Sequence, residues 1–334
     1  MEFDILDCTL RDGGYVNGWM FSNEISNAII DGLYRAGVRW IEIGLMGNSK
    51  DNKEKTKFNS FEQIKPLLLS RRKDCYYAVM VTTSSSDEFI YPKRSELTPD
   101  VIRIAFFKPE IAKTFDLAQR LISLGYMVFL QPMATFMYSD KELEELILMV
   151  NRIQPFGMYM VDSFSTMYPK DIIEMEDKIL SILDKNIIFG LHAHNNIQMA
   201  FANAQAFISN APNDRKILID ASIYGMGRGA GNVPAELLLS YCNSKYNRKY
   251  DVSFLLELFD KYFKTIYQEN SWGYSLPYFL TSINKMNSVW AWFFMQNGIL
   301  DLSRLDKAFN LVPFEQRYTL NAVLGKEIIE KVCK

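Results

Sequence analysis

Histidine is the scarcest informative residue in this chain. Its 334 residues include two, His192 and His194, and both lie in one stretch, GLHAHNN. A chain with so few imidazoles has little choice of side chain for moving a proton near neutral pH. The pairing of both histidines in one stretch makes it the first candidate for a functional site.

Cysteine is also sparse. The four cysteines, Cys8, Cys75, Cys242 and Cys333, are scattered and form no CxxC pair. This spacing argues against a zinc knuckle and against a disulfide framework. The opening MEFDILDCTL lacks the basic and apolar pattern of a signal peptide. We therefore expect a cytoplasmic protein that folds without covalent cross-links.

The chain has no large excess of either charge and no long apolar run. Its formal net charge is -2, and hydrophobic residues make up 49% of it. Nucleic-acid binding typically requires a strongly basic surface, and a membrane helix requires about 20 consecutive apolar residues. We therefore expect a globular protein that binds neither nucleic acid nor membrane.

Eight short runs of apolar and β-branched residues recur along the chain, and segments with helical spacing separate most of them. One such segment, SNEISNAIIDGLYRAG, has Ser22 as a candidate N-cap and Gly37 as a stop signal. This rhythm predicts an α/β fold, a (β/α)8 TIM barrel over residues 1–245, in preference to a doubly wound sheet. The eight runs begin at Phe3, Val38, Tyr76, Val101, Met127, Met158, Ile187 and Ile217.

The rhythm of strands ends near Tyr246. Residues 246–334 show helical patterning and many aromatic side chains, including Trp290 and Trp292, which predicts a helical C-terminal region. Exposed aromatic clusters are typical of contact surfaces, so a homodimer is one hypothesis for this region.

Polar residues stand at the ends of several predicted strands. Arg11 and Asp12 precede two glycines after the first strand, Glu42 ends the second, and Asp162 ends the sixth. Reactive groups of a TIM barrel collect at the carboxyl ends of its strands. We therefore expect these side chains to converge with the histidine pair.

His192 and His194 lie two residues apart on the predicted seventh strand, so their imidazoles share one face. Two neutral imidazoles and one carboxylate form a common divalent-metal site, and Asp12 is the natural third ligand. The alternative is that the histidines are structural polar residues at a strand end. A glycine-rich segment, YGMGRGAGN from Tyr224 to Asn232, follows the eighth strand. It is either a flexible loop or a backbone packed close to a ligand.

Five motifs, in order along residues 1 to 245, resemble the DRE-TIM metallolyase superfamily, and within it the 4-hydroxy-2-oxovalerate aldolase branch. The resemblance implies Mn²⁺ or Mg²⁺ held by Asp12, His192 and His194, with Asn232 as a further ligand, and Arg11 as the group that stabilises an enolate. The motifs are LDCTLRDGG, IRIAF, MYMVDSFSTMYP, GLHAHNNIQMAFANA and DASIYGMGRGAGNVPAELL.

The chain departs from the aldolase branch at its general base. That branch carries a histidine a few residues after the RD pair, where this sequence has Tyr15. With both histidines assigned to metal, the proton carrier is Tyr15, Glu42, Asp162 or a metal-bound water. The segment WGYSLPYFLTS resembles a tyrosine-bearing motif of the same branch, which makes Tyr274 and Tyr278 candidates, with core packing as the alternative.

The resemblance implies a metal-dependent aldolase that cleaves a 4-hydroxy-2-oxo acid through a pyruvate-type enolate. Two alternatives stay open: a Claisen-type acyltransferase that condenses acetyl-CoA with a 2-oxo acid, and a catalytically silent homologue that retains the metal. The aldolase branch pairs with an aldehyde dehydrogenase, so the resemblance also implies a possible partner of that class.

Overall fold

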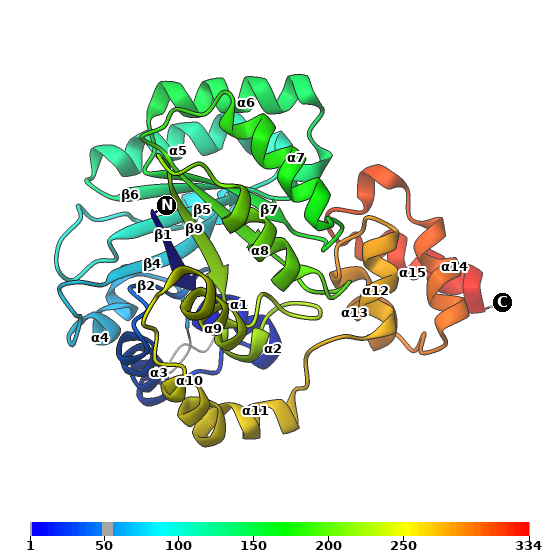
Figure 1. The fold of residues 1–334 in the computed structure, drawn as a ribbon. Helices are drawn as coiled ribbons and strands as arrows, with labels where there is room; N and C mark the ends of the chain where they lie inside the picture. Colours follow the sequence, from blue (N-terminus) through cyan, green and yellow to red (C-terminus); the bar gives the residue numbers. More distant parts are fainter. Residues whose placement is uncertain (1, 49–55, 334) are drawn as a thin grey trace.

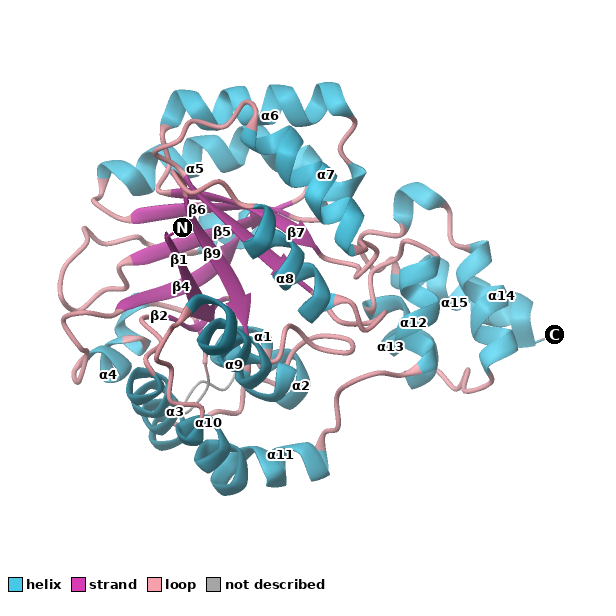
Figure 2. Ribbon diagram, viewed as in Figure 1, coloured by secondary structure: helices cyan, strands magenta, loops and turns pink. Residues whose placement is uncertain are grey.

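The computed structural model describes residues 2–48 and 56–333, and its centre is a closed barrel of parallel strands (Figures 1 and 2). The strands pair in the order β1, β9, β8, β7, β6, β5, β4 and β2, and a β1–β2 pairing closes the ring. The predicted (β/α)8 barrel is confirmed, and each predicted strand begins within two residues of an observed one. The strands are β1 (Glu2–Asp7), β2 (Trp40–Met46), β4 (Tyr76–Thr82), β5 (Val101–Phe106), β6 (Met127–Pro132), β7 (Gly157–Asp162), β8 (Ile188–Ala193) and β9 (Lys216–Ala221), with a short β3 (Lys57–Phe58) paired to the end of β2.

Helices cover the outside of the barrel (Figure 2). Helix α3 (Asn23–Ala36) obeys its local signals: the Ser22 side chain accepts a hydrogen bond from the Ile25 amide, and Gly37 ends the helix with a φ of 97°. Between β4 and β5 the connection holds a short 3₁₀ segment, Thr83–Glu88, in place of a long helix. The other outer helices are α4 (Lys65–Leu68), α5 (Ile111–Ser123), α6 (Asp140–Ile153), α7 (Pro169–Leu180), α8 (Ala200–Asn210) and α9 (Ala235–Tyr246).

Inside the barrel, side chains change from apolar to charged toward the carboxyl ends of the strands. Alternate residues of a strand share a face, so Val101 and Arg103 both point inward on β5, as do Leu218 and Asp220 on β9. Val101 and Leu218 belong to one apolar cluster inside the barrel. Arg103 and Asp220 form an ion pair above it. The polar layer is therefore sealed from below and opens toward the carboxyl ends of the strands.

The C-terminal region forms two groups of helices. Helices α10 (Ser253–Leu258) and α11 (Lys264–Glu269) pack on the outer core of the barrel. Helices α12 (Leu276–Ile283), α13 (Val289–Gln296), α14 (Leu302–Leu311) and α15 (Ala322–Cys333) build a separate small core. Figure 1 shows this second group at one side of the barrel. The Ser282 hydroxyl donates a hydrogen bond of 2.6 Å to the Phe164 carbonyl, which attaches the group to the loop after β7.

Among the helices of the described residues, none combines the length and the apolar character that crossing a bilayer requires.

One buried acid on the outside of the barrel should make stability depend on pH. Glu176 of α7 is buried, and this burial raises the pKa of its carboxyl to about 8. Because the folded protein holds this proton more tightly than the unfolded chain, stability should fall as pH rises from the unfolded pKa of 4.5 to about 8. Glu176→Gln removes the ionisable group and keeps an oxygen that can accept from Asn210. We expect a gain of roughly 1–3 kcal/mol at pH 8.

Urea unfolding of the wild type and of this variant from pH 5 to pH 8.5 measures the effect. Glu174→Gln is the matched control, because Glu174 is exposed on the same helix. Equal pH slopes for Glu176→Gln and the wild type would contradict the prediction.

Candidate metal centre

The first strand leads into a helical turn that presents Arg11 and Asp12. Strand β1 ends at Asp7, and helices α1 (Thr9–Asp12) and α2 (Gly14–Asn17) follow it. The Asp7 carboxylate accepts hydrogen bonds of 2.9 Å from both the amide and the hydroxyl of Thr9, which fixes the turn. Arg11 and Asp12 therefore lie on a helix one turn beyond the strand. The sequence pattern predicts them at the strand end itself, and the structure corrects this.

Asp12, His192 and His194 converge at one point. Each offers a ligand atom, and these atoms all lie within 4.8 Å of one another. The two imidazole rings have centroids 5.0 Å apart, and all three residues are less than 5% exposed. The convergence predicted for these three side chains is present at the carboxyl end of the barrel.

The ionisation states of these groups suit metal binding. Burial lowers the pKa of His194 to about 3, so its imidazole is neutral at physiological pH. Burial opposes ionisation of Asp12, but the positive charge of Arg11 beside it outweighs this effect and holds the pKa of this carboxyl well below its usual range. A neutral imidazole and an ionised carboxylate are the forms that bind a cation.

Hydrogen bonds also orient both rings. His192 Nδ1 lies 2.8 Å from Asp220 Oδ2, and His194 Nδ1 lies 3.3 Å from the Gly231 carbonyl. Both partners are acceptors, so each Nδ1 carries the proton and each Nε2 keeps a free lone pair. This arrangement resembles the carboxylate–histidine and carbonyl–histidine pairs that orient metal ligands.

Several buried atoms beside this cluster have no hydrogen-bond partner in the part of the chain that the structure describes, among them Asn232 Oδ1 and Arg11 Nη2. The Asn232 amide nitrogen donates 2.8 Å to Asp12 Oδ2, so Asn232 Oδ1 remains as a candidate fourth ligand. Leaving a buried polar atom unpaired costs about 1–3 kcal/mol. A bound cation would satisfy the first atom, and an anionic oxygen would satisfy the second, so the residues present fit the metal that the family resemblance implies.

The glycine-rich segment packs directly against the candidate ligands. A Cβ on Gly227 would lie 2.5 Å from Asp12 Oδ2, which leaves room for glycine alone at this position. The next residue, Arg228, donates its backbone amide to the same oxygen at 3.2 Å. The predicted close approach of this backbone is therefore made to the Asp12 carboxylate.

Charged residues inside the barrel hold the cluster from below. Arg103 pairs with Glu42 at 2.8 Å and with Asp220, while Glu42 also accepts 2.7 Å from Arg11 Nε. Arg11 in turn pairs with Asp12. Two guanidinium groups thus face three carboxylates, and this excess of one negative charge favours a cation beside them.

Sequence reasoning missed Arg103 and Asp220. The available signal was a charged residue inside each of two otherwise apolar strands, VIRIAF and ILIDAS. Such a residue must point into the barrel or onto a helix, and a buried charge requires a partner. The pattern marks these residues as paired without naming the partner.

Two predicted proton carriers are occupied elsewhere. Glu42 Oε2 accepts hydrogen bonds from both Arg11 and Arg103. The Asp162 carboxylate accepts from the Thr166 and Met167 amides at 2.8 and 3.1 Å, and burial raises its pKa to about 6. Glu42 therefore orients the arginines, and Asp162 ties down the loop after β7.

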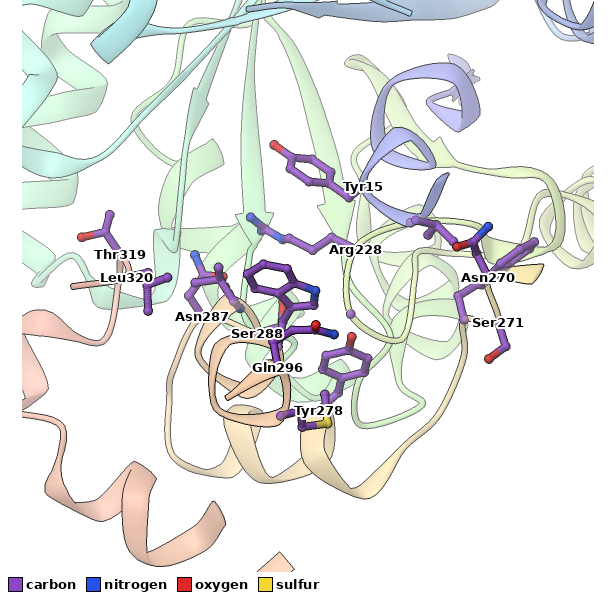
Figure 3. A pocket seen from close by; sticks show the side chains of 17 residues that line it. Tyr15, Arg228, Asn270, Ser271, Tyr278, Asn287, Ser288, Gln296, Thr319 and Leu320 are labelled. Carbon is purple, nitrogen blue, oxygen red and sulfur yellow. Dashed lines mark hydrogen bonds between the residues drawn. The ribbon is translucent and has the colours of Figure 1, made fainter. Parts of the chain in front are cut away.

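The tyrosine candidates separate into two places. Tyr15 is 43% exposed and lines a cavity of about 700 Å³ above the cluster, and Tyr278 lines it from α12 (Figure 3). Tyr274 is 54% exposed and lines a different depression, which the candidate ligand Asn232 also lines. Tyr15 and Tyr278 thus line one cavity, and Tyr274 lines a separate depression that Asn232 borders.

Removing the acceptor behind His192 should weaken metal binding. Asp220→Asn replaces a charged acceptor with a neutral one, which loosens the imidazole and lowers its basicity. We expect Mn²⁺ affinity to fall about 10–100-fold, measured by calorimetry at pH 7.5. Asp162→Asn on β7, which flanks the histidine strand β8 on the other side from β9, is the matched control. Its carboxylate binds loop amides, so the variant should retain wild-type affinity. An equal loss in both variants would contradict this assignment.

Several known proteins are similar to this chain in sequence. Residues 2–260 match the HMGL-like family model. A 4-hydroxy-2-oxovalerate aldolase of Geobacillus genomosp. 3 is 29% identical over 242 residues, which cover 71% of this chain and 69% of that protein. An oxaloacetate decarboxylase of Mycobacterium tuberculosis is 26% identical over 245 residues, covering 71% of this chain and 68% of that protein.

A solved structure agrees with these relatives. The N-terminal domain of a candidate aldolase from Bacteroides vulgatus has a TM-score of 0.76 at 27% identity, and the match covers 90% of this chain and 99% of that one. The resemblance predicted from five motifs is confirmed, because the family model spans most of the sequence. This chain belongs to the HMGL-like family of the DRE-TIM metallolyases.

Proposed function

We propose that this protein is a divalent-metal-dependent aldolase that cleaves a 4-hydroxy-2-oxo acid into a 2-oxo acid and an aldehyde. The observation that carries the proposal is the buried cluster of Asp12, His192, His194 and Asn232, with the unpaired Nη2 of Arg11 beside it. Membership of a lyase and aldolase family supports the reaction class.

The reaction requires stabilisation of one negative charge. Breaking the C3–C4 bond leaves its electron pair as an enolate, while C4 loses its hydroxyl proton and becomes the aldehyde carbon. A divalent cation at the cluster would supply Lewis-acid stabilisation of the enolate oxygen. Arg11 Nη2 would donate to the same oxygen, and its guanidinium is held for this task by Glu42 and Asp12.

Tyr15 is the residue we assign to the C4 hydroxyl. It is the member of the predicted set of proton carriers that lines the cavity with its side chain exposed, whereas Glu42 and Asp162 are buried and hydrogen-bonded. In this role Tyr15 hydrogen-bonds the hydroxyl and passes its proton to solvent at the open mouth of the cavity. Solvent then returns a proton to C3 of the enolate.

Oxaloacetate decarboxylation is the second candidate. Loss of CO₂ from oxaloacetate leaves the same type of enolate without removal of a hydroxyl proton. The chain has two histidines and both lie in the cluster, so a reaction that needs no imidazole base suits it. The similarity to a decarboxylase of Mycobacterium tuberculosis supports the same alternative.

Asp12→Asn tests the proposal as a whole. With Mn²⁺ and a panel of 4-hydroxy-2-oxo acids, the wild type should release aldehyde, and the variant should lose at least about 10²–10³-fold in kcat/KM. Thiol release from acetyl-CoA with 2-oxo acids would instead favour the acyltransferase. Metal binding without turnover of any substrate would favour the silent homologue, and full activity of Asp12→Asn would remove the metal mechanism.

Tyr15→Phe separates the two reactions. The variant should lose about 10²-fold or more in kcat for aldol cleavage, because the C4 hydroxyl loses its proton acceptor. Oxaloacetate decarboxylation should stay near the wild-type rate, because it has no such proton to move. Equal losses in both reactions would contradict this role for Tyr15, and unchanged aldol cleavage would remove it.

A further inference from the structure

The cavity above the metal centre has two lobes. The larger, of about 700 Å³, lies against α12 and α13, and the smaller, of about 590 Å³, lies against the loops after β4, β5 and β6. Four residues line both lobes: Tyr15, Arg228, Asn287 and Thr319. The lobes therefore meet at these residues, next to Gly227 and Arg228, which pack on Asp12, and together exceed the space that a five-carbon oxo acid needs.

Arg228 stands at this junction with its position fixed by the metal centre. Its backbone amide donates to Asp12 Oδ2 at 3.2 Å, so its Cα cannot move far from the cluster. Its guanidinium carbon lies 5.5 Å from the centre of the Tyr15 ring. Figure 3 shows the side chain extending through the cavity between Tyr15 on one side and Asn287 and Ser288 on the other.

Within the described residues no close ion pair or hydrogen bond holds the guanidinium of Arg228, and its charge acts on the Asp12 carboxylate from a longer distance. Among the residues lining the larger lobe, Arg228 carries the one formal charge. The walls there combine aromatic and apolar side chains, such as Trp272 and Trp292, with neutral polar ones, such as Asn270 and Gln296. A partly buried guanidinium in such surroundings attracts an anion strongly, because less water screens it.

The smaller lobe differs in this respect. Lys108 there pairs with Glu142 at 2.6 Å, and Glu110 accepts from the Phe107 amide at 2.8 Å. Glu315 adds a further acidic side chain to that lining. Unbalanced positive charge is thus confined to the junction and the larger lobe, which is where a second negative group of the substrate would be stabilised.

We infer that Arg228 binds a second anionic group, a carboxylate or a phosphate, at the end of the substrate far from the 2-oxo acid. The preferred substrate would then be a 4-hydroxy-2-oxo acid whose aldehyde half carries its own negative charge. This inference rests on the proposed function, since the oxo-acid end is assigned to the cluster of Asp12, His192 and His194. Arg228 is then a residue that determines specificity.

Ligand binding tests the inference without turnover. The probes are 2-oxoglutarate, its phosphonate analogue 2-oxo-4-phosphonobutanoate, and 2-oxopentanoate, which has the same five-carbon chain as 2-oxoglutarate and no distal charge. Calorimetry on the full chain with saturating Mn²⁺ should show at least about 10-fold tighter binding of a dianionic probe than of 2-oxopentanoate. Comparison of the two anionic probes tells carboxylate from phosphate.

The variant Arg228→Gln should lose about 10–100-fold in affinity for the preferred anionic probe, and its affinity for 2-oxopentanoate should change little. Arg228→Lys should restore part of the loss, because it keeps the charge without the two-pronged geometry. Lys108→Gln is the matched control, since it removes one positive charge from the smaller lobe. It should change the preference by less than about threefold.

Three results would overturn the inference: equal binding by the wild type of probes with and without a distal charge, an equal loss for both kinds of probe in Arg228→Gln, or an effect of Lys108→Gln as large as that of Arg228→Gln. Failure of every probe to bind the Mn²⁺-loaded wild type would instead overturn the proposed function, and this inference with it. Binding of 2-oxopentanoate that depends on Asp12, without any anion preference, would leave the proposed function standing and remove the role of Arg228.

Discussion

The pairing of Arg103 with Glu42 and Asp220 inside the barrel is the interaction on which the site depends. All three side chains are fully buried, so each charge has lost its hydration and is stabilised by its partners alone. Glu42 also pairs with Arg11, and Asp220 also contacts His192 Nδ1, so both of these side chains are held in place by the same buried ion pairs. The ligand cluster above is therefore positioned by a rigid ionic layer, and a change at any one of these residues leaves a buried charge uncompensated.

The fold shields this ionic layer from water on one side. Strand alternation places apolar residues such as Val101 and Leu218 one step below the charges, which keeps water out from that side. On the opposite side of the charges, helix α12 contributes Tyr278 to the cavity, and the connection between α12 and α13 contributes Asn287. The charges thus lie between the apolar cluster inside the barrel and the cavity, where electrostatic interactions are stronger than in bulk water.

Much of this arrangement could be predicted from sequence, because it follows from local periodicity. The eight strands and the convergence of Asp12 with His192 and His194 depend on strand period and on barrel topology, both of which the pattern carries. The hydrogen-bond partners of the strand-end side chains could not be predicted from this pattern. Glu42 and Asp162 both end strands in the predicted way, yet one binds two arginines and the other binds loop amides. Those partners come from distant segments, and strand position alone does not identify them. The same limit applies to Tyr274 and Tyr278. They are four positions apart, one before α12 and one within it, and the sequence does not show which of them lines the cavity.

The two histidines explain the character of the site. Each has its Nδ1 bound to an acceptor and lies in the candidate ligand cluster, so neither imidazole is free to carry protons for a substrate. The site therefore suits reactions that depend mainly on stabilising negative charge and only slightly on removing a proton. Arg11 and a bound cation can provide that stabilisation. Arg228 extends the same principle along the cavity, because it adds fixed positive charge at a distance from the reacting atoms. On the proposed function, a site built in this way would select its substrate by where the negative charges lie, and Tyr15, which lines both lobes, would take up the single proton that cleavage releases.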